Sequence, residues 1–180
     1  MSELKIYAEN NSASARVVSE HAVIAHELGD IGVLFERWET QRELSDHAGQ
    51  DEVIAAYRDS VDRLLSNYHF QSVDVISLQP DHPDRDALRA KFLNEHTHSD
   101  YEVRFFVDGK GLFYIHQGQQ VYGVLCEKGD LISVPANTTH WFDMGPNPDF
   151  KCIRLFTSPE GWVANFTGSD IASRFPRLEN

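Results

Sequence analysis

The sequence predicts a mainly β fold with helices, of the α+β class, in which helices from the N-terminal half pack on an antiparallel β-barrel or sandwich. The length of 180 residues suits one domain. Apolar residues recur with helical periods before residue 95, and short β-branched and aromatic segments separated by turn residues follow it. We therefore expect a single domain over residues 1–180, with residues 1–94 as an elaboration of helices and strands and residues 95–180 as the barrel.

Three helices are expected in the N-terminal half. Ser19–Leu28 has helical periodicity and precedes Gly29, which suits the left-handed position after a helix. Asp51–Tyr68 is the clearest helix, because its large apolar residues recur at spacings of three and four and Asp51 can cap its N-terminus. A third helix is expected to start at Asp84. Strands are predicted here at Leu4–Ala8, Val33–Trp38 and Val73–Leu78.

The C-terminal half predicts a series of short strands. Turn residues such as Asp108-Gly109 and Gly145-Pro146 separate these strands. Their spacing, near ten residues, is typical of an antiparallel sandwich or barrel. The predicted strands are Val103–Val107, Gly111–Ile115, Gln120–Cys126, Leu131–Val134, His140–Asp143 and Lys151–Phe156.

Composition and charge exclude several classes of partner. Sixteen Lys and Arg against 28 Asp and Glu give a formal net charge of −12, which repels phosphate backbones and anionic lipids. The longest apolar stretches have the length of strands, and no basic region followed by an apolar segment opens the chain. Two cysteines are too few for a disulfide framework. We expect a cytoplasmic monomer that binds neither nucleic acid nor membranes.

The segment His96-Thr97-His98-Ser99-Asp100-Tyr101-Glu102 predicts a metal site. Residues two apart on a strand point to the same face, so His96 and His98 can reach one point, and Glu102 shares their parity. His140 follows a later strand and a proline-containing turn and supplies a fourth ligand. The helical zinc-protease pattern His-Glu-x-x-His is absent. The alternative is that these are unrelated histidines among the nine in the chain.

This set of ligands favours a catalytic metal over a structural one. Three imidazoles and one carboxylate suit Fe, Ni, Mn, Co or Zn, and ligand type alone does not choose among them. Four protein ligands on an octahedral ion leave two adjacent positions open. Those positions can bind a chelating substrate.

Strand parity identifies further candidates around the metal. Arg104 shares a face with Glu102, and Arg154 shares a face with Cys152 on a later strand. An inward arginine is costly unless an anion or carboxylate meets it, so two of them beside a cation imply an anionic ligand. The alternative for each is an exposed strand face. Phe142 shares parity with His140 and can line the site, whereas other histidines, such as His116, lack a partner at ligand spacing.

The two ligand-bearing segments resemble the cupin motifs, G-x5-H-x-H-x3,4-E-x6-G and G-x5-P-x-G-x2-H-x3-N. All four ligand positions match, as does Gly109. The departures are Ala90 at the first Gly, Asn137 at the Gly after the proline and Met144 at the final Asn. Asn tolerates the left-handed conformation that Gly would adopt in such a turn. The resemblance implies a cupin-type antiparallel β-barrel, or jelly roll, that holds the metal.

Longer stretches are similar to the acireductone dioxygenase family of the methionine salvage pathway, over most of residues 33–178. They are Lys91–His98, Asp100–Val107, Cys126–Pro135, His140–Gly145, Glu160–Trp162, Phe166–Gly168, Asp170–Ala172, Phe35–Trp38, Val53–Tyr57 and Asp74–Leu78. The first thirty residues contribute little. The resemblance implies that one Fe(II) or Ni(II) per chain is held by His96, His98, Glu102 and His140.

The same resemblance implies the reaction. The substrates would be acireductone (1,2-dihydroxy-3-keto-5-methylthiopentene) and O2, and the products depend on the metal. Fe(II) gives formate and 2-keto-4-methylthiobutyrate, whereas Ni(II) gives formate, CO and methylthiopropionate. Arg104 and Arg154 match family positions near the substrate oxygens, and Phe92, Phe142 and Trp162 match positions that wall the pocket for the methylthioalkyl tail.

Two other interpretations remain open at this point. One is another cupin enzyme, an isomerase or a different dioxygenase, that uses the same ligands. The other is a non-catalytic metal-bound barrel that senses a small molecule. A transcriptional sensor usually carries a basic DNA-binding module, and a chain with a net charge of −12 gives no sign of one.

Overall fold

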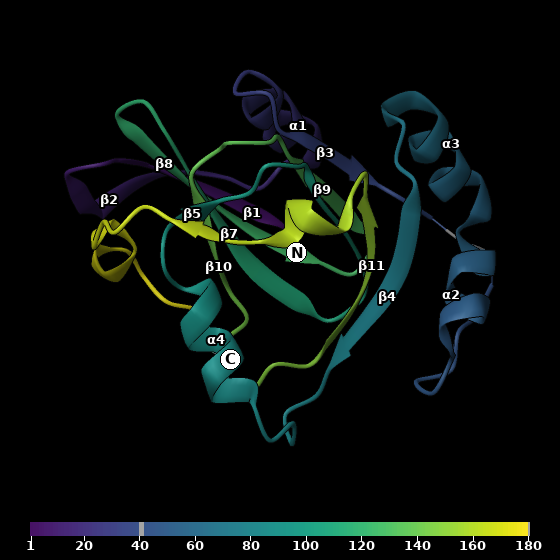
Figure 1. The fold of residues 1–180 in the computed structure, drawn as a ribbon. Coiled ribbons are helices and arrows are strands. Elements are labelled where there is room, and N and C mark those ends of the chain that lie inside the picture. The colour runs from purple at the N-terminus through teal and green to yellow at the C-terminus, as the bar shows by residue number, and fades with distance from the viewer. Residues whose placement is uncertain (40–41, 180) are drawn as a thin grey trace.

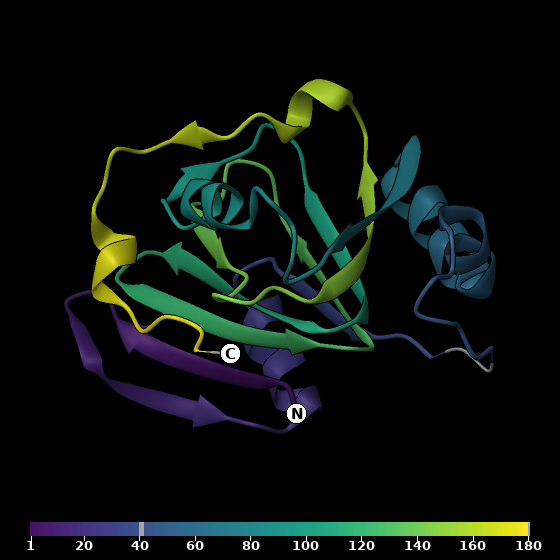
Figure 2. The ribbon, with the colours of Figure 1, turned by 90° about the horizontal axis from the view of Figure 1, so that it is seen from below.

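The computed structural model describes residues 1–39 and 42–179, and this part of the chain folds into two antiparallel sheets that face each other as a barrel (Figures 1 and 2). The seven-stranded sheet has the order β12–β5–β10–β7–β8–β1–β2, and the five-stranded sheet has the order β3–β9–β6–β11–β4. The prediction of a mainly β, cupin-type barrel with helices is confirmed.

Strands from both halves of the sequence build the two sheets. The first sheet contains β1 (Glu3–Ala8), β2 (Asn11–Val18), β5 (His96–Thr97), β7 (Lys110–Gln117), β8 (Gln120–Glu127), β10 (His140–Asp143) and β12 (Asn165–Phe166). The second contains β3 (Leu34–Arg37), β4 (Ser72–Leu78), β6 (Glu102–Asp108), β9 (Asp130–Val134) and β11 (Phe150–Phe156). The strands before residue 95 therefore extend the barrel sheets themselves.

Helices cover the outside and one end of the barrel. The α-helices are α1 (His21–Gly29), α2 (Gln50–Ala56), α3 (Arg58–Tyr68) and α4 (Arg85–Phe92), and the 3-10 helices are η1 (Pro159–Trp162) and η2 (Ile171–Arg174). Figure 1 shows α2 and α3 beside β4, and α4 at the end of the barrel near β10. None of the described helices is long and apolar enough to cross a membrane.

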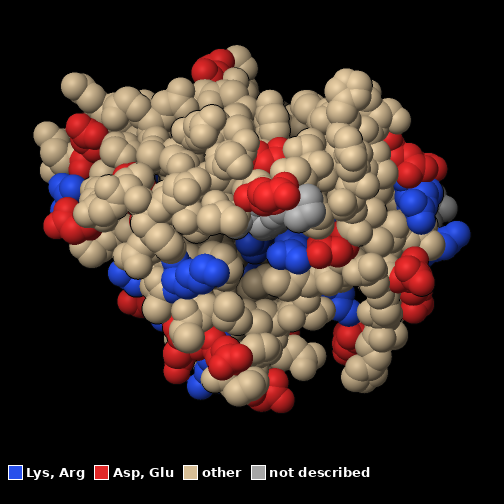
Figure 3. Space-filling model, in the orientation of Figure 1, with Lys and Arg blue, Asp and Glu red and all other residues tan. Residues whose placement is uncertain are grey.

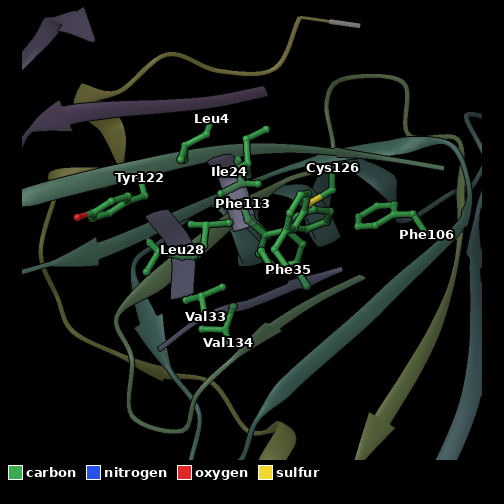
Figure 4. Packing of buried hydrophobic residues seen from close by; sticks show 14 of the residues in the cluster. Leu4, Ile24, Leu28, Val33, Phe35, Phe106, Phe113, Tyr122, Cys126 and Val134 are labelled. Atoms are coloured by element: carbon green, nitrogen blue, oxygen red, sulfur yellow. The ribbon is translucent and has the colours of Figure 1, made fainter. Parts of the chain in front are cut away.

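Alternation along the strands separates an inner core from an outer one. Phe106 and Cys152 belong to the cluster of buried residues between the sheets, and Figure 4 shows Phe106 in this cluster. Their neighbours Phe105 and Ile153 point outward and pack under the helices α2 and α3. Side chains two apart on a strand thus share a face, as the sequence predicts. Glu102 and Arg104 share a face of β6 with Phe106, so their side chains lie inside the barrel.

Local details of the fold differ from the predictions. The expected helix 51–68 is two helices, because Tyr57 leaves helical geometry (φ −114°, ψ 21°) where its buried ring packs 4.7 Å from that of Phe105. Gly29 is the last residue of α1, and the positive φ expected there occurs at Gly32 (φ 80°). The strand β2 was not predicted, because it pairs only with β1 at the sheet edge and its side chains are largely exposed.

The turn before β10 adopts the conformation expected from the sequence. Asn137 has φ 61°, in the left-handed region that the cupin motif assigns to Gly. We expect Asn137→Gly to retain the stability of the wild type, and Asn137→Val to lower the free energy of unfolding by about 1–2 kcal/mol, because a β-branched residue is strained there. Urea unfolding of both variants measures this. Equal stability of the Val and Gly variants would contradict it.

Candidate metal centre

Four buried side chains converge inside one end of the barrel. They are His96, His98, Glu102 and His140, and their potential ligand atoms all lie within 4.8 Å of one another. Each residue is at most 7% exposed. Among the described residues, this is the group that the geometry identifies as able to hold a metal ion. The sequence prediction that these four residues come together is therefore correct in placement.

Short strand pairings bring the four residues together. His140 begins β10 and is the register partner of His96 on β5. Glu102 begins β6 in the opposite sheet, and the loop that joins β5 to β6 carries His98. The Asn137 backbone N–H donates to the His98 carbonyl over 2.8 Å, so the turn before β10 also fixes this loop.

Each histidine is oriented by a backbone carbonyl behind its ring. The Nδ1 of His96 lies 2.7 Å from the Asn94 carbonyl, that of His140 lies 2.7 Å from the Thr138 carbonyl, and that of His98 lies 3.2 Å from the Val163 carbonyl. A carbonyl only accepts hydrogen bonds, so each Nδ1 is the donor, and in the neutral imidazole Nε2 carries the lone pair that can bind a metal. This is how metal-binding imidazoles are held by their surroundings in proteins.

The fourth member of the group lies against two of these Nε2 atoms. The Glu102 Oε2 is 2.8 Å from His140 Nε2 and 3.1 Å from His98 Nε2. Three imidazole nitrogens and one carboxylate oxygen form a donor set that suits Fe, Ni, Mn, Co or Zn. The residues present therefore fit a divalent transition metal.

The pKa values of these groups reflect burial and mutual contact. Burial, together with the neighbouring His140, lowers the pKa of His96 to about 4, so this imidazole is neutral at physiological pH. Burial alone would raise the pKa of Glu102, but Arg104 and hydrogen bonds from His140 and His98 hold it well below its usual range. Burial disfavours the charged form of His98 and would lower its pKa, but the contact of His98 with Glu102 outweighs burial and raises that pKa. A neutral imidazole and an ionised carboxylate are the states that bind metals.

Arg104 lies beside the carboxylate inside the barrel, as parity predicts. It is 3% exposed, and its Nε is 3.0 Å from Glu102 Oε1. Its guanidinium carbon lies 5.2 Å from the ring centroid of Phe142 and 5.8 Å from that of Phe92. Two of the aromatic residues predicted to wall a pocket are thus placed beside Arg104. The side chain of the third, Trp162, lies outside the described part of the structure.

Arg154 is also on the inner face, but it already has an anionic partner. It is the register partner of Arg104, and its guanidinium makes two hydrogen bonds to Asp74 on β4. An inward arginine needs a carboxylate or an anion beside it. Asp74 supplies that carboxylate for Arg154, and the sequence alone did not indicate it.

Two further carboxylates near the metal centre were missed. Asp100 accepts hydrogen bonds from the backbone N–H groups of Thr157 and Ser158 and from the Thr157 hydroxyl, and so fixes the segment that leads to η1. Glu95, 4% exposed and adjacent to His96, accepts a hydrogen bond from the Thr167 hydroxyl. The only signal in the sequence was that both lie next to the His-x-His motif.

Glu95 also meets a histidine that the sequence left without a role. The His116 Nδ1 is 2.7 Å from Glu95 and its Nε2 is 2.9 Å from Glu9, so the imidazole lies between two carboxylates. Burial lowers the pKa of His116, but the hydrogen bonds to Glu9 and Glu95 outweigh burial and raise it. His82, which also has no partner at ligand spacing in the sequence, is half-buried, and its Nδ1 accepts a hydrogen bond from the Asp84 backbone N–H over 3.1 Å.

The raised pKa of His116 predicts a pH-dependent contribution to stability. The folded chain binds this proton more tightly than the unfolded chain, so the stabilisation is complete below an unfolded pKa of about 6.5 and is lost as the pH rises through the folded value. We expect His116→Gln to lower the free energy of unfolding by about 1 kcal/mol more at pH 6 than at pH 9. The difference is no larger because the Glu9 side chain is partly exposed, and solvent screens its pair with His116.

Urea unfolding of His116→Gln and the wild type at both pH values, in the same metal state, measures this difference. His26→Gln is the matched control, since His26 is exposed and its Nε2 is 3.7 Å from the exposed Asp30. A cost for His116→Gln that stayed constant, or grew towards pH 9, would contradict the expectation.

The face of the molecule that α4 borders is hollowed at its surface. Figure 3 shows a hollow in this face of the molecule, between α4 and the strands β11 and β4, with Lys and Arg side chains beside it. Asp and Glu side chains also lie near this hollow, and on a chain with a net charge of −12 the Lys and Arg side chains beside it favour the approach of a small anion.

Comparisons with known proteins agree with this site. A family model described as the ARD/ARD' family matches residues 3–164. The chain belongs to the ARD/ARD' family. An acireductone dioxygenase of Methylococcus capsulatus is 60% identical over 180 residues, which cover 100% of this chain and 97% of that protein. An acireductone dioxygenase of Aquifex aeolicus is 56% identical, and the match covers 99% of this chain and 97% of that protein.

A solved structure extends the comparison within the ARD/ARD' family. The acireductone dioxygenase of Bacillus anthracis, solved with a cadmium ion in its active centre, is 30% identical and superposes with a TM-score of 0.80. The superposition covers 92% of this chain and 98% of that one. Full-length similarity to several acireductone dioxygenases disfavours the interpretation as a metal-bound sensor.

Proposed function

We propose that this chain is a metal-dependent dioxygenase that cleaves acireductone with O2. The observation that carries the proposal is the convergence of three buried imidazoles and the buried Glu102 carboxylate next to Arg104. His96, His98, Glu102 and His140 would hold one Fe(II) or Ni(II). When bound, the metal supplies Lewis acidity and a template for two substrate oxygens.

The protein residues have separate tasks in this proposal. Arg104 contributes a buried positive charge and planar N–H donors where the substrate oxygens carry negative charge. Phe92 and Phe142, whose rings flank Arg104, suit an alkyl thioether tail, because sulfur packs well against aromatic rings. Burial of all four ligand residues keeps bulk water away from the reacting atoms.

The products would depend on the metal. With Fe(II), acireductone and O2 would give formate and 2-keto-4-methylthiobutyrate, and with Ni(II) they would give formate, CO and methylthiopropionate. All four proposed ligands belong to one chain, which supports a site that is complete in a monomer. Cys126 and Cys152 are free thiols, which suits the reducing cytoplasm.

Product analysis after metal exchange tests the proposal. The metal-stripped chain is reloaded with Fe(II) and given acireductone and O2, and formate plus the 2-keto acid should form faster than in the uncatalysed reaction. Reloading with Ni(II) should shift the products towards CO. No catalysed product from a chain with measured metal content would refute the dioxygenase proposal and favour another cupin chemistry.

A further inference from the structure

Three charged residues form a row across the inner face of the five-stranded sheet. Arg104 on β6 is the register partner of Arg154 on β11, and Arg154 is in turn the register partner of Asp74 on β4. Cys152, two residues from Arg154, belongs to the inner core, and Leu155 belongs to the outer one, so the row faces the barrel interior. It therefore lies on the same face as Glu102.

The two arginines of this row would repel each other without compensation by Asp74. Like charges directly opposite each other on neighbouring strands are destabilising, and Arg104 and Arg154 are such a pair. The Asp74 carboxylate compensates for this, because it accepts from Arg154 Nε over 2.8 Å and from a terminal nitrogen over 2.6 Å. A two-point contact of this kind fixes the plane of the guanidinium as well as its charge.

The two arginines have different kinds of partner. Arg104 pairs with Glu102, which is itself a proposed metal ligand. Arg154 pairs with Asp74, which lies outside the group of metal-binding side chains. The Arg154 and Asp74 side chains are 25% and 30% exposed, so the pair is half-buried and within reach of a small ligand.

We propose that Asp74 is a positioning residue for the reaction: it holds the Arg154 guanidinium on the inner face beside Arg104, in the orientation that receives the anionic substrate. This inference rests on the proposed function. Without Asp74, repulsion from Arg104 and the opening to solvent move Arg154 away from the inner face. The site then binds an anion less tightly, although it has lost a negative charge.

Steady-state kinetics on a double-mutant cycle test the inference. Asp74→Ala should raise KM about tenfold and change kcat less than about threefold, because the residue acts on binding through Arg154. Arg154→Ala should have a similar effect, and the double variant should be no worse than Arg154→Ala alone. Asp74→Asn, which keeps one acceptor oxygen, should fall between the wild type and Asp74→Ala.

Equilibrium binding separates this inference from the proposed function. Calorimetric titration of the metal-loaded variants with oxalate, a dianionic two-oxygen chelator, should show the same pattern without turnover, with Kd raised about tenfold in Asp74→Ala. A wild type that binds oxalate but does not turn over acireductone would refute the proposed function, and the oxalate series would still decide the role of Asp74.

A surface ion pair provides the matched control. Glu27 pairs with Arg16 over 2.7 Å on the exposed outside of the molecule, and Glu27→Gln should leave KM, kcat and Kd unchanged. Unchanged values for Asp74→Ala would overturn the inference. So would tighter anion binding in Asp74→Ala and Asp74→Asn, which would mean that Asp74 acts only by neutralising charge, or additive losses in the double variant, which would mean that the two residues act independently.

Discussion

His140→Ala is expected to lower metal occupancy and turnover together, each by at least about 100-fold. His140 supplies one of three converging imidazoles, and its Nε2 also contacts the Glu102 carboxylate over 2.8 Å. Loss of a residue that only supports a metal ligand typically costs 10- to 100-fold in affinity, so loss of a ligand costs at least as much. Metal content after gel filtration, measured by mass spectrometry, gives the occupancy.

The fold of this variant should survive. His140 keeps its backbone place in β10, between β7 and β5, and the apolar core extends well beyond the site. Removing a buried imidazole ring leaves a cavity that lowers the free energy of unfolding by on the order of 2–4 kcal/mol. Far-ultraviolet circular dichroism should therefore match the wild type, and thermal unfolding should remain cooperative.

His26→Ala is the control for the loss of a histidine as such. The His26 side chain is exposed on α1 and is not a member of the metal-binding group, so metal content and turnover should not change. A fully metallated and active His140→Ala variant would remove His140 from the site. The site would then be reduced to the two histidines and the glutamate of the first motif.

The barrel and its four converging side chains could be predicted because their determinants are local. The alternation around Arg104 and Arg154 requires only a strand, so parity assigns both to the inner face. The expected strand His140–Asp143 has the bounds of β10. Asn137 signals a left-handed turn by its own chemistry, and the structure has it there.

The partners of these side chains could not be predicted, because they depend on which strands become neighbours. Asp74 lies 80 positions before Arg154 in the sequence, and only the pairing of β4 with β11 joins them. His116 meets Glu9 from the end of β1 in the same way. Periodicity also does not show that Tyr57 interrupts a helix, because the interruption arises from packing against a ring on β6.

Arg104→Ala is expected to lower kcat/KM by about 100- to 1,000-fold while metal content at neutral pH stays at the wild-type level. Removing one fixed donor that stabilises developing negative charge has a cost of this size in other enzymes. The metal should remain, because all four proposed ligands are intact and the metal itself compensates the charge of Glu102. The measurement is steady-state kinetics on protein of known metal content.

Arg104→Lys separates charge from geometry. Lysine keeps the positive charge but loses the planar set of donors, so activity between that of the wild type and that of Arg104→Ala is expected. Arg16→Ala, on the exposed surface, should have wild-type kinetics. Unaltered kinetics in Arg104→Ala would mean that a buried guanidinium 3.0 Å from Glu102 serves only to compensate that carboxylate before the metal binds. A bound metal would then compensate the charge of Glu102 in place of Arg104. Only Arg154 and the metal would remain to hold the substrate.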